Sequence, residues 1–127
     1  MDPIYQEELK EIYKNPKHKG HIADATSQIQ EQNPLCGDNI NLQLKIEGNI
    51  IKEAKFEGAA CAVSILSSEK LLTYIEGKSV KEISEMTQKR LLEILGIDIS
   101  MSRIRCATLV FTALKKALEN YENNERN

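Results

Sequence analysis

The chain has 127 residues, of which 41% are hydrophobic and 28% charged, and its formal net charge is −2 at pH 7. This composition excludes wholesale disorder, and the length suits one domain over residues 1–127 with its own hydrophobic core. Lysines and arginines are scattered among acidic residues and no apolar run is long enough to span a membrane, so we expect neither nucleic acid nor membrane as a partner.

The first half of the chain is predicted to form one helix and a small antiparallel sheet. Residues 3–14 carry Ile4, Leu9 and Ile12 on one helical stripe, and residues 22–30 are weakly extended. From residue 40 to residue 46, apolar residues alternate strictly with polar ones, which is the pattern of a half-buried strand. The residues EGN then turn the chain, and residues 50–57 return as a second strand, so residues 40–57 are predicted to form a β-hairpin.

The second half is predicted to be helical. After Gly58 the apolar period changes to about 3.6 residues and stops at Gly77. Residues 79–86 and 87–95 each begin with Ser or Thr followed by Glu or Gln, which indicates two short capped helices. A last helix follows, and residues 122–127 are expected to fray at its end. The apolar stripe of the first helix after Gly58 comprises Ala62, Ile65, Leu66, Leu72 and Ile75, and that of the last helix comprises Ile104, Ala107, Val110, Phe111, Leu114, Leu118 and Tyr121.

This order of elements is typical of an α+β fold in which a small antiparallel sheet of about three strands packs against helices. The N-terminal residues lack the basic and then apolar pattern of a signal peptide, so we expect a cytoplasmic protein with reduced thiols.

Three cysteines are the first candidates for chemistry. Cys36, Cys61 and Cys106 are odd in number and widely spaced, which argues against a disulfide framework. Free cysteines are often small buried hydrophobes. Here, however, Cys36 precedes the hairpin, Cys61 opens the helix after it, and Cys106 lies in the first turn of the last helix. Functional sites are more often built at such ends of elements.

Asp38 follows Cys36 with only Gly37 between them, and the segment NPLCGDN is either a plain turn or a pair of metal ligands. Three thiolates and one carboxylate would suit a tetrahedral zinc or iron ion, and Gly37 would allow the sharp bend that directs both side chains to one point. The second and third cysteines follow 25 and then 45 residues further along, so the fold would have to assemble such a site. His18 and His21 also resemble a small metal pair, but they lie beside a solvated turn and we do not assign them as ligands.

Positive charge and helix N-termini favour the thiolate form of cysteine. Cys61 and Cys106 both lie at predicted helix starts. Arg103 is three residues before Cys106 and on the same side of the helix, whereas Arg105 projects nearly opposite. We therefore assign Arg103 to the site and Arg105 to solvent, with a surface salt bridge as the alternative for Arg103.

Four segments together resemble the iron–sulfur cluster assembly proteins of the NifU/IscU type, most closely the SufU branch. They are YKNPKHKG, NPLCGDNINLQLKIEGNIIKEAKFEG, AACAVSILSSEKL and SRIRCATLVFTALKKAL, and the resemblance runs from about residue 5 to residue 119. It implies a SufE/NifU-like domain in which Cys36, Asp38, Cys61 and Cys106 converge on one exposed site. That site would hold Zn²⁺ or a transient [2Fe–2S] cluster.

The resemblance also implies partners. Family members receive persulfide sulfur from a pyridoxal-phosphate cysteine desulfurase of the SufS, IscS or NifS type, and apo iron–sulfur proteins or carriers would take the product. Cys36 or Cys106 would accept sulfur beside Arg103, and we favour Cys36 because a turn can move without unwinding a helix. The chain would then be a zinc-dependent sulfurtransferase; the alternatives are a non-enzymatic cluster scaffold and a purely structural zinc domain that binds a protein partner.

Two features differ from the family pattern. Arg105 stands where IscU-type proteins carry a histidine before the third cysteine, and ISMSRI replaces their proline-rich chaperone-docking motif. The 45 residues from the second cysteine to the third also leave no room for the additional stretch that SufU-type proteins usually carry there.

Overall fold

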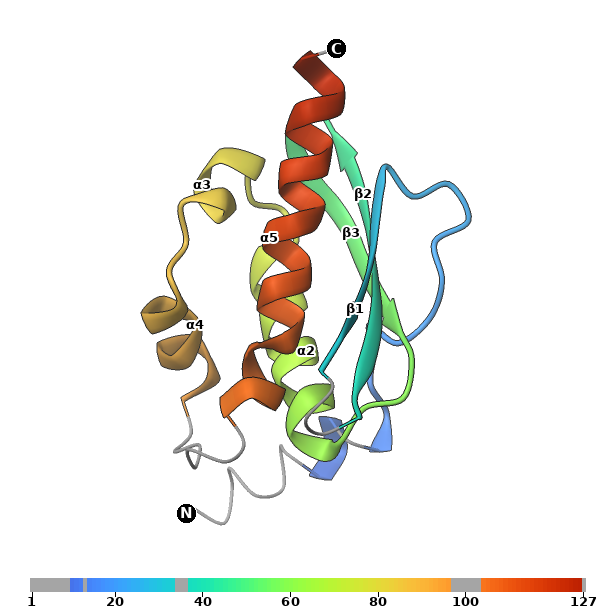
Figure 1. The fold of residues 1–127 in the computed structure, drawn as a ribbon, viewed down its shortest axis with the longest axis vertical. Coiled ribbons are helices and arrows are strands. Elements are labelled where there is room, and N and C mark those ends of the chain that lie inside the picture. The colour runs from blue at the N-terminus through green and yellow to red at the C-terminus, as the bar shows by residue number, and fades with distance from the viewer. Residues whose placement is uncertain (1–9, 13, 34–36, 97–103, 127) are drawn as a thin grey trace.

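The computed structural model describes residues 10–12, 14–33, 37–96 and 104–126, and its architecture is α+β, as predicted. Figure 1 shows a small sheet with the described helices after it packed on one side. The strands are β1 (Ser27–Gln32), β2 (Asn39–Glu47) and β3 (Ile50–Glu57), and the helices are α2 (Ala62–Ile75), α3 (Val80–Ser84), α4 (Gln88–Leu95) and α5 (Ile104–Arg126).

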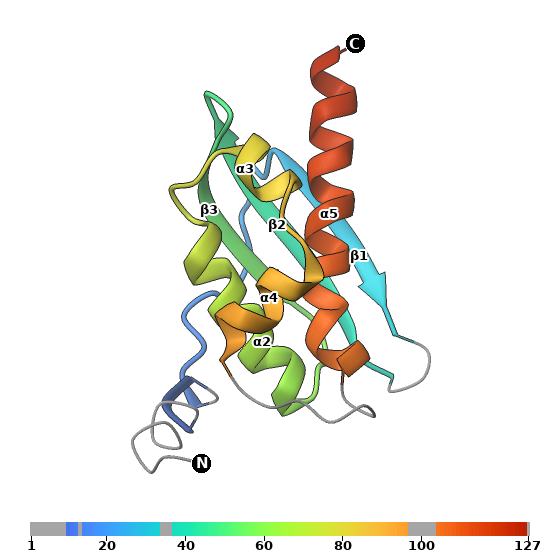
Figure 2. The ribbon, with the colours of Figure 1, turned by 90° about the vertical axis from the view of Figure 1, so that its left-hand side faces the viewer.

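The sheet has the order β1-β2-β3, and both neighbouring pairs are antiparallel. The predicted hairpin is confirmed as β2 and β3, with Leu42 paired to Phe56. Ile40, Leu42, Leu44 and Ile46 of β2 are buried because they face the helices. As the two ribbon views show, α5 packs across β1 and β2, and α2 lies beside α5 and β3 (Figures 1 and 2).

The opposite face of β2 is covered by the chain before β1. Phe56 N–H donates to the His18 carbonyl over 2.9 Å at the β3 edge, whereas Thr26 N–H donates to the Leu44 carbonyl over 2.7 Å, on the β1 side of β2. The residues between them therefore cross the sheet, and Gln43 is fully buried beneath them. The prediction of a half-buried β2 is wrong at Gln43, because the preceding chain covers this side chain. The Gln43 amide oxygen accepts the Ile22 N–H.

β1 begins five residues later than the weakly extended segment predicted from sequence and runs Ser27–Gln32. Its buried face carries polar residues, so the sequence of β1 lacks the apolar alternation that predicts a strand. Ser27 Oγ donates to the Ala117 carbonyl over 2.7 Å, and Glu31 accepts from Lys116 over 2.7 Å. Ile29 on the same face packs against the hydrophobic core, so polar and apolar contacts together hold β1 in place.

The later helices agree closely with their predicted limits. Ser79 and Thr87 cap α3 and α4 through their hydroxyl oxygens, which accept the N–H groups of Glu82 and Arg90. The helix α5 continues to Arg126, beyond Tyr121, the last residue of its predicted apolar stripe. None of the described helices is long and apolar enough to cross a membrane. The buried residues of α5 include Ala107, Val110, Phe111, Leu114, Leu118 and Tyr121, as its apolar pattern predicted.

The buried face of α2 differs from the predicted stripe. Ala62 is exposed, while four polar residues that the prediction did not include are buried. They are Ser64, Ser67, Ser68 and Glu69. Leu66, Leu72 and Ile75 are buried as predicted, so α2 packs against the hydrophobic core and also buries side chains that make hydrogen bonds.

Candidate metal centre

Asp38, directly before β2, is held next to Asn33 by backbone hydrogen bonds. Asn33 N–H donates to the Asp38 carbonyl and Gly37 N–H donates to the Asn33 carbonyl, each over 2.9 Å. Gly37 has a φ of 75°, in the left-handed region that favours glycine, as expected for the bend before Asp38.

A close backbone approach joins the start of β2 to the start of α2. Asn39 N–H donates to the Ala59 carbonyl over 2.8 Å. Gly58 has a φ of 124°, and a Cβ atom placed on it would lie 2.3 Å from the Asn39 carbonyl oxygen. Only glycine fits this approach, which brings Cys61, the N-cap residue of α2, next to Asp38.

Cys106 reaches the same place from α5. It lies in the first turn of that helix and is 1% exposed. Ser64 Oγ lies 2.9 Å from the Cys106 carbonyl, and Ser67 Oγ donates to the Ala107 carbonyl. Small side chains at this crossing let α2 and α5 approach closely enough for these bonds.

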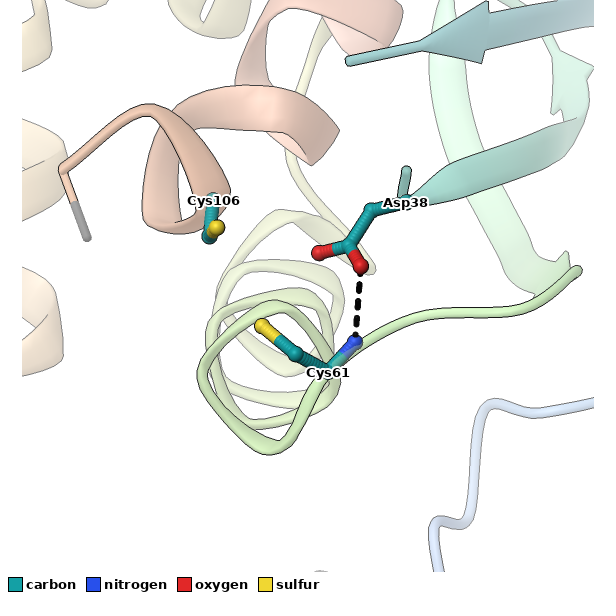
Figure 3. A group of neighbouring side chains, drawn as sticks. All are labelled: Asp38, Cys61 and Cys106. Atoms are coloured by element: carbon teal, nitrogen blue, oxygen red, sulfur yellow. Dashed lines mark hydrogen bonds between the residues drawn. The ribbon is translucent and has the colours of Figure 1, made fainter. Parts of the chain in front are cut away.

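Asp38, Cys61 and Cys106 converge from three segments, and their ligand atoms all lie within 4.8 Å of one another (Figure 3). Asp38 Oδ1 accepts the Cys61 N–H over 3.2 Å. Donor atoms around one tetrahedral zinc ion lie about 3.5 to 4 Å apart, so small side-chain movements suffice to bring these three atoms to one ion. Asp38 and Cys106 are buried and Cys61 is partly exposed, so the group is open to solvent at Cys61.

Two sulfur donors and one oxygen donor fit zinc or iron in their chemistry. The remaining predicted site residues, Cys36 and Arg103, lie outside the described residues. Arg105 is exposed, as expected. The structure thus brings together three of the four predicted ligands.

Comparison with known proteins agrees with this arrangement. The model of the NifU-like N terminal domain matches residues 4–127. The chain belongs to this family. Among its relatives, the zinc-dependent sulfurtransferase SufU of Bacillus subtilis (strain 168) is 32% identical, over 96% of this chain and 94% of that protein. The alignment spans 139 positions, more than this chain has residues, so SufU contains residues that this NifU-like domain lacks.

Scaffold proteins are also among the relatives. The iron–sulfur cluster assembly scaffold protein IscU 1 of Archaeoglobus fulgidus is 29% identical, over 93% of this chain and 76% of that protein. A crystal structure of a proposed iron–sulfur cluster assembly scaffold protein for the SUF system, from Fervidobacterium islandicum AW-1, has a TM-score of 0.75 and 26% identity. The match covers 91% of this chain and 96% of that one.

The two histidines of this NifU-like domain do not form a pair. The His18 ring lies between two carboxylates, with Nδ1 2.8 Å from Glu69 and Nε2 2.6 Å from Glu76. His21 lies 3.0 Å from Glu57 instead. The expected solvated turn is wrong for His18, whose side chain is only 12% exposed because α2 covers it.

Ser64 is the residue at the centre that the sequence analysis missed. It is fully buried, and its hydroxyl lies 2.6 Å from Asp38 Oδ2. A signal was available in the spacing, because Cys61, Ser64 and Ser68 are three and four residues apart and therefore share one face of a helix. This spacing places Ser64 on the same side of α2 as Cys61, beside Asp38.

Proposed function

We propose that this NifU-like chain works in iron–sulfur cluster assembly and that Cys36, Asp38, Cys61 and Cys106 are its metal ligands. The observation that carries the proposal is the convergence of Asp38, Cys61 and Cys106 from the starts of β2, α2 and α5 within 4.8 Å. The family membership, with SufU and IscU proteins among the relatives, supports it.

The donor set favours a working centre over a structural one. Structural zinc sites are closed and use four cysteine or histidine ligands, whereas here a carboxylate takes part and Cys61 is partly exposed. Cys36 is two residues before Asp38, and two residues of chain span at most about 7 Å, so Cys36 is a reasonable fourth ligand. A bound zinc ion would keep the thiols deprotonated and oriented.

Cys36 is our proposed sulfur acceptor. Cys61 is the N-cap of α2 and Cys106 is buried in α5, so neither can move far without disturbing a helix. The Cys36 thiolate would attack the outer sulfur of a persulfide on a cysteine desulfurase. The old S–S bond breaks, a new one forms on Cys36, and the desulfurase cysteine leaves as a thiolate, with no net oxidation. Arg103, next to α5 in the chain, would offset negative charge at this point.

The test of sulfur transfer uses a cysteine desulfurase of the SufS type. Adding the full chain should raise the turnover of cysteine and produce an adduct of about 32 Da, one sulfur atom, that reductant removes. Cys36→Ser should lose the adduct, whereas Thr112→Ser, an exposed change on α5, should keep it. Unchanged turnover together with no adduct on any cysteine would rule out the sulfur-acceptor role.

The second role within the same function is that of a scaffold on which a [2Fe–2S] cluster is built as cargo. The oxygen ligand Asp38 favours it, since one carboxylate among thiolates makes a cluster easier to release. Elemental analysis and a visible spectrum of protein purified without oxygen distinguish the two roles. Colourless protein with zinc supports sulfur relay, and brown protein with iron and acid-labile sulfide supports the scaffold.

A further inference from the structure

Ser64 contacts all three described residues of the metal centre. Its hydroxyl oxygen lies 2.6 Å from Asp38 Oδ2, 2.9 Å from the Cys106 carbonyl oxygen and 3.7 Å from Cys61 Sγ. A hydroxyl group has one hydrogen, so it donates to one of the two oxygens at a time. The shorter distance and the charge of the carboxylate favour Asp38 as the acceptor.

The helix α2 therefore orients both carboxylate oxygens of Asp38. Oδ1 accepts the Cys61 N–H, and Oδ2 accepts the Ser64 hydroxyl. Two bonds from one rigid helix fix the rotation of the carboxylate group. Carboxylates that bind metals are commonly held by such outer hydrogen bonds, and losing one bond weakens metal affinity.

We propose that Ser64 is a positioning residue that orients Asp38 toward the metal. The inference rests on the proposed metal site. The Cys106 carbonyl gives Ser64 a second acceptor, so the hydroxyl stays hydrogen-bonded when Asp38 turns away during ligand exchange. This second bond lets the oxygen ligand leave without exposing a buried, unsatisfied hydroxyl, which would be unfavourable.

Ser67 provides a matched control on the same helix. It is buried like Ser64 and its hydroxyl also donates to a backbone carbonyl of α5, that of Ala107. This partner is not a ligand side chain, however. Changing Ser67 to alanine therefore removes a similar bond between α2 and α5 while leaving the contacts of Asp38 in place.

The experiment measures the Zn²⁺ dissociation constant of the full chain by competition with a chromogenic chelator. Ser64→Ala should weaken zinc binding by about 10- to 100-fold, and Ser67→Ala should change it by less than about twofold. In an Asp38→Ala background, adding Ser64→Ala should cause no further loss, because the residue acts through Asp38. Thermal unfolding of the zinc-free proteins should show similar stability losses for the two serine variants.

Three results would overturn the inference: unchanged zinc binding in Ser64→Ala, equal weakening in Ser67→Ala, or the same loss with and without Asp38. If the unaltered protein binds no zinc or iron, the proposed metal site fails first and the inference fails with it. Should Ser64→Ala not fold, Ser64→Thr and Ser64→Val replace it, since this pair differs only in a hydroxyl against a methyl group. The Ser64→Thr variant is then expected to bind zinc more tightly than the Ser64→Val variant by about the same factor, and equal binding would overturn the inference.

Discussion

Asp38 has two sets of partners at the metal centre. Its carboxylate accepts hydrogen bonds from the start of α2, and one carboxylate oxygen lies within 4.8 Å of the sulfur atoms of Cys61 and Cys106. With Cys36 included, the proposed ligand set carries about four negative charges against two on a zinc or ferrous ion. Among thiolates, the oxygen ligand should be held least firmly, which makes Asp38 the point at which ligand exchange begins.

We therefore expect Asp38→Ala to hold a reconstituted [2Fe–2S] cluster for longer than the unaltered protein, because the change removes the group through which release starts. The decay of the visible absorption after reconstitution with iron and sulfide measures this lifetime. The zinc-free variant should also lose about 1 to 3 kcal/mol of unfolding free energy, since the Cys61 N–H loses its acceptor and the Ser64 hydroxyl exchanges a charged acceptor for the Cys106 carbonyl.

Asp38→Asn is the control for the loss of unfolding free energy, because its amide oxygen can still accept the Cys61 N–H. If Asp38→Ala assembles no cluster although Asp38→Asn folds normally, Asp38 is an essential ligand and the account of a labile ligand is wrong.

Among contacts between secondary-structure elements, His18 links the segment before β1 to α2 through hydrogen bonds. Its ring nitrogens contact Glu69 and Glu76, and its backbone N–H donates to Glu69 Oε1 over 2.6 Å. The hydrogen bond to Glu69 raises the pKa of His18 above its ordinary value near 6.5, with a further rise from Glu76 and partial opposition from burial. Both ring nitrogens can donate to these carboxylates only when the imidazole carries its second proton.

The raised pKa gives a stability term that depends on pH. The term is fully present below the unfolded pKa of about 6.5 and is lost as the pH rises through the higher pKa of the folded protein. We expect His18→Gln to lower the unfolding free energy of the zinc-free protein most near pH 6 and least near pH 9. Urea unfolding at several pH values measures the difference.

His21→Gln is the control, because the His21 side chain is 58% exposed and exposed ion pairs contribute little to stability. A His18→Gln effect that is constant over this pH range would contradict the assignment of the stabilising form to the imidazolium.

Gly58 sets the distance between two elements of the centre. We expect Gly58→Ala to lower the unfolding free energy by more than Gly77→Ala, which should lose about 1 to 2 kcal/mol through its left-handed backbone alone. At Gly77 nothing lies within 4 Å of an added Cβ, whereas at Gly58 the new atom displaces the Asn39 backbone. Because Asn39 adjoins Asp38, Gly58→Ala should also weaken zinc binding, which chelator competition would measure. Equal losses of unfolding free energy in Gly58→Ala and Gly77→Ala would contradict the close approach at Gly58.

The sequence predicts those helices and strands whose own residues show an apolar period or a capping residue. The β2–β3 hairpin, the capped helices α3 and α4 and the apolar face of α5 are local in this sense, and Cys61, Asp38 and Cys106 are recognisable by their ligand chemistry. The polar contacts are different, because each depends on a partner far along the chain. Ser27 bonds a residue 90 positions away, His18 one 51 positions away and Ser64 one 42 positions away. No local period indicates such a pairing, so the polar contacts of β1 and α2 could not be predicted from sequence. The spacing from Cys61 indicates the helix face of Ser64 but not its partners on other elements.

For the whole molecule, the metal centre lies where three elements begin. A metal bound there would join the starts of β2, α2 and α5, which lie at the same end of the molecule (Figures 1 and 2). These two helices and this strand contribute residues to the hydrophobic core. An ion that binds only the folded chain stabilises it by RT ln(1 + [ion]/Kd).

We therefore expect zinc at about 1,000 times its Kd to raise the unfolding free energy by about 4 kcal/mol, and a chelator to reverse this gain. Denaturant unfolding with and without zinc measures the effect. Cys61→Ser should show a much smaller zinc-dependent gain, and a full gain in this variant would place the bound ion elsewhere.

Cys106 lies in the last described helix and is therefore synthesised after the other three proposed ligands. Cys36, Asp38 and Cys61 leave the ribosome before Cys106, which follows Cys61 by 45 residues. At about 5 to 20 residues per second, the growing chain spends roughly 2 to 9 s with three proposed ligands and without the fourth. During that interval the apolar face of the sheet also lacks α5, which covers β1 and β2 in the finished fold. The nascent chain thus offers an incomplete thiol site beside an uncovered sheet, and all four proposed ligands are available to one metal ion only after Cys106 has been synthesised.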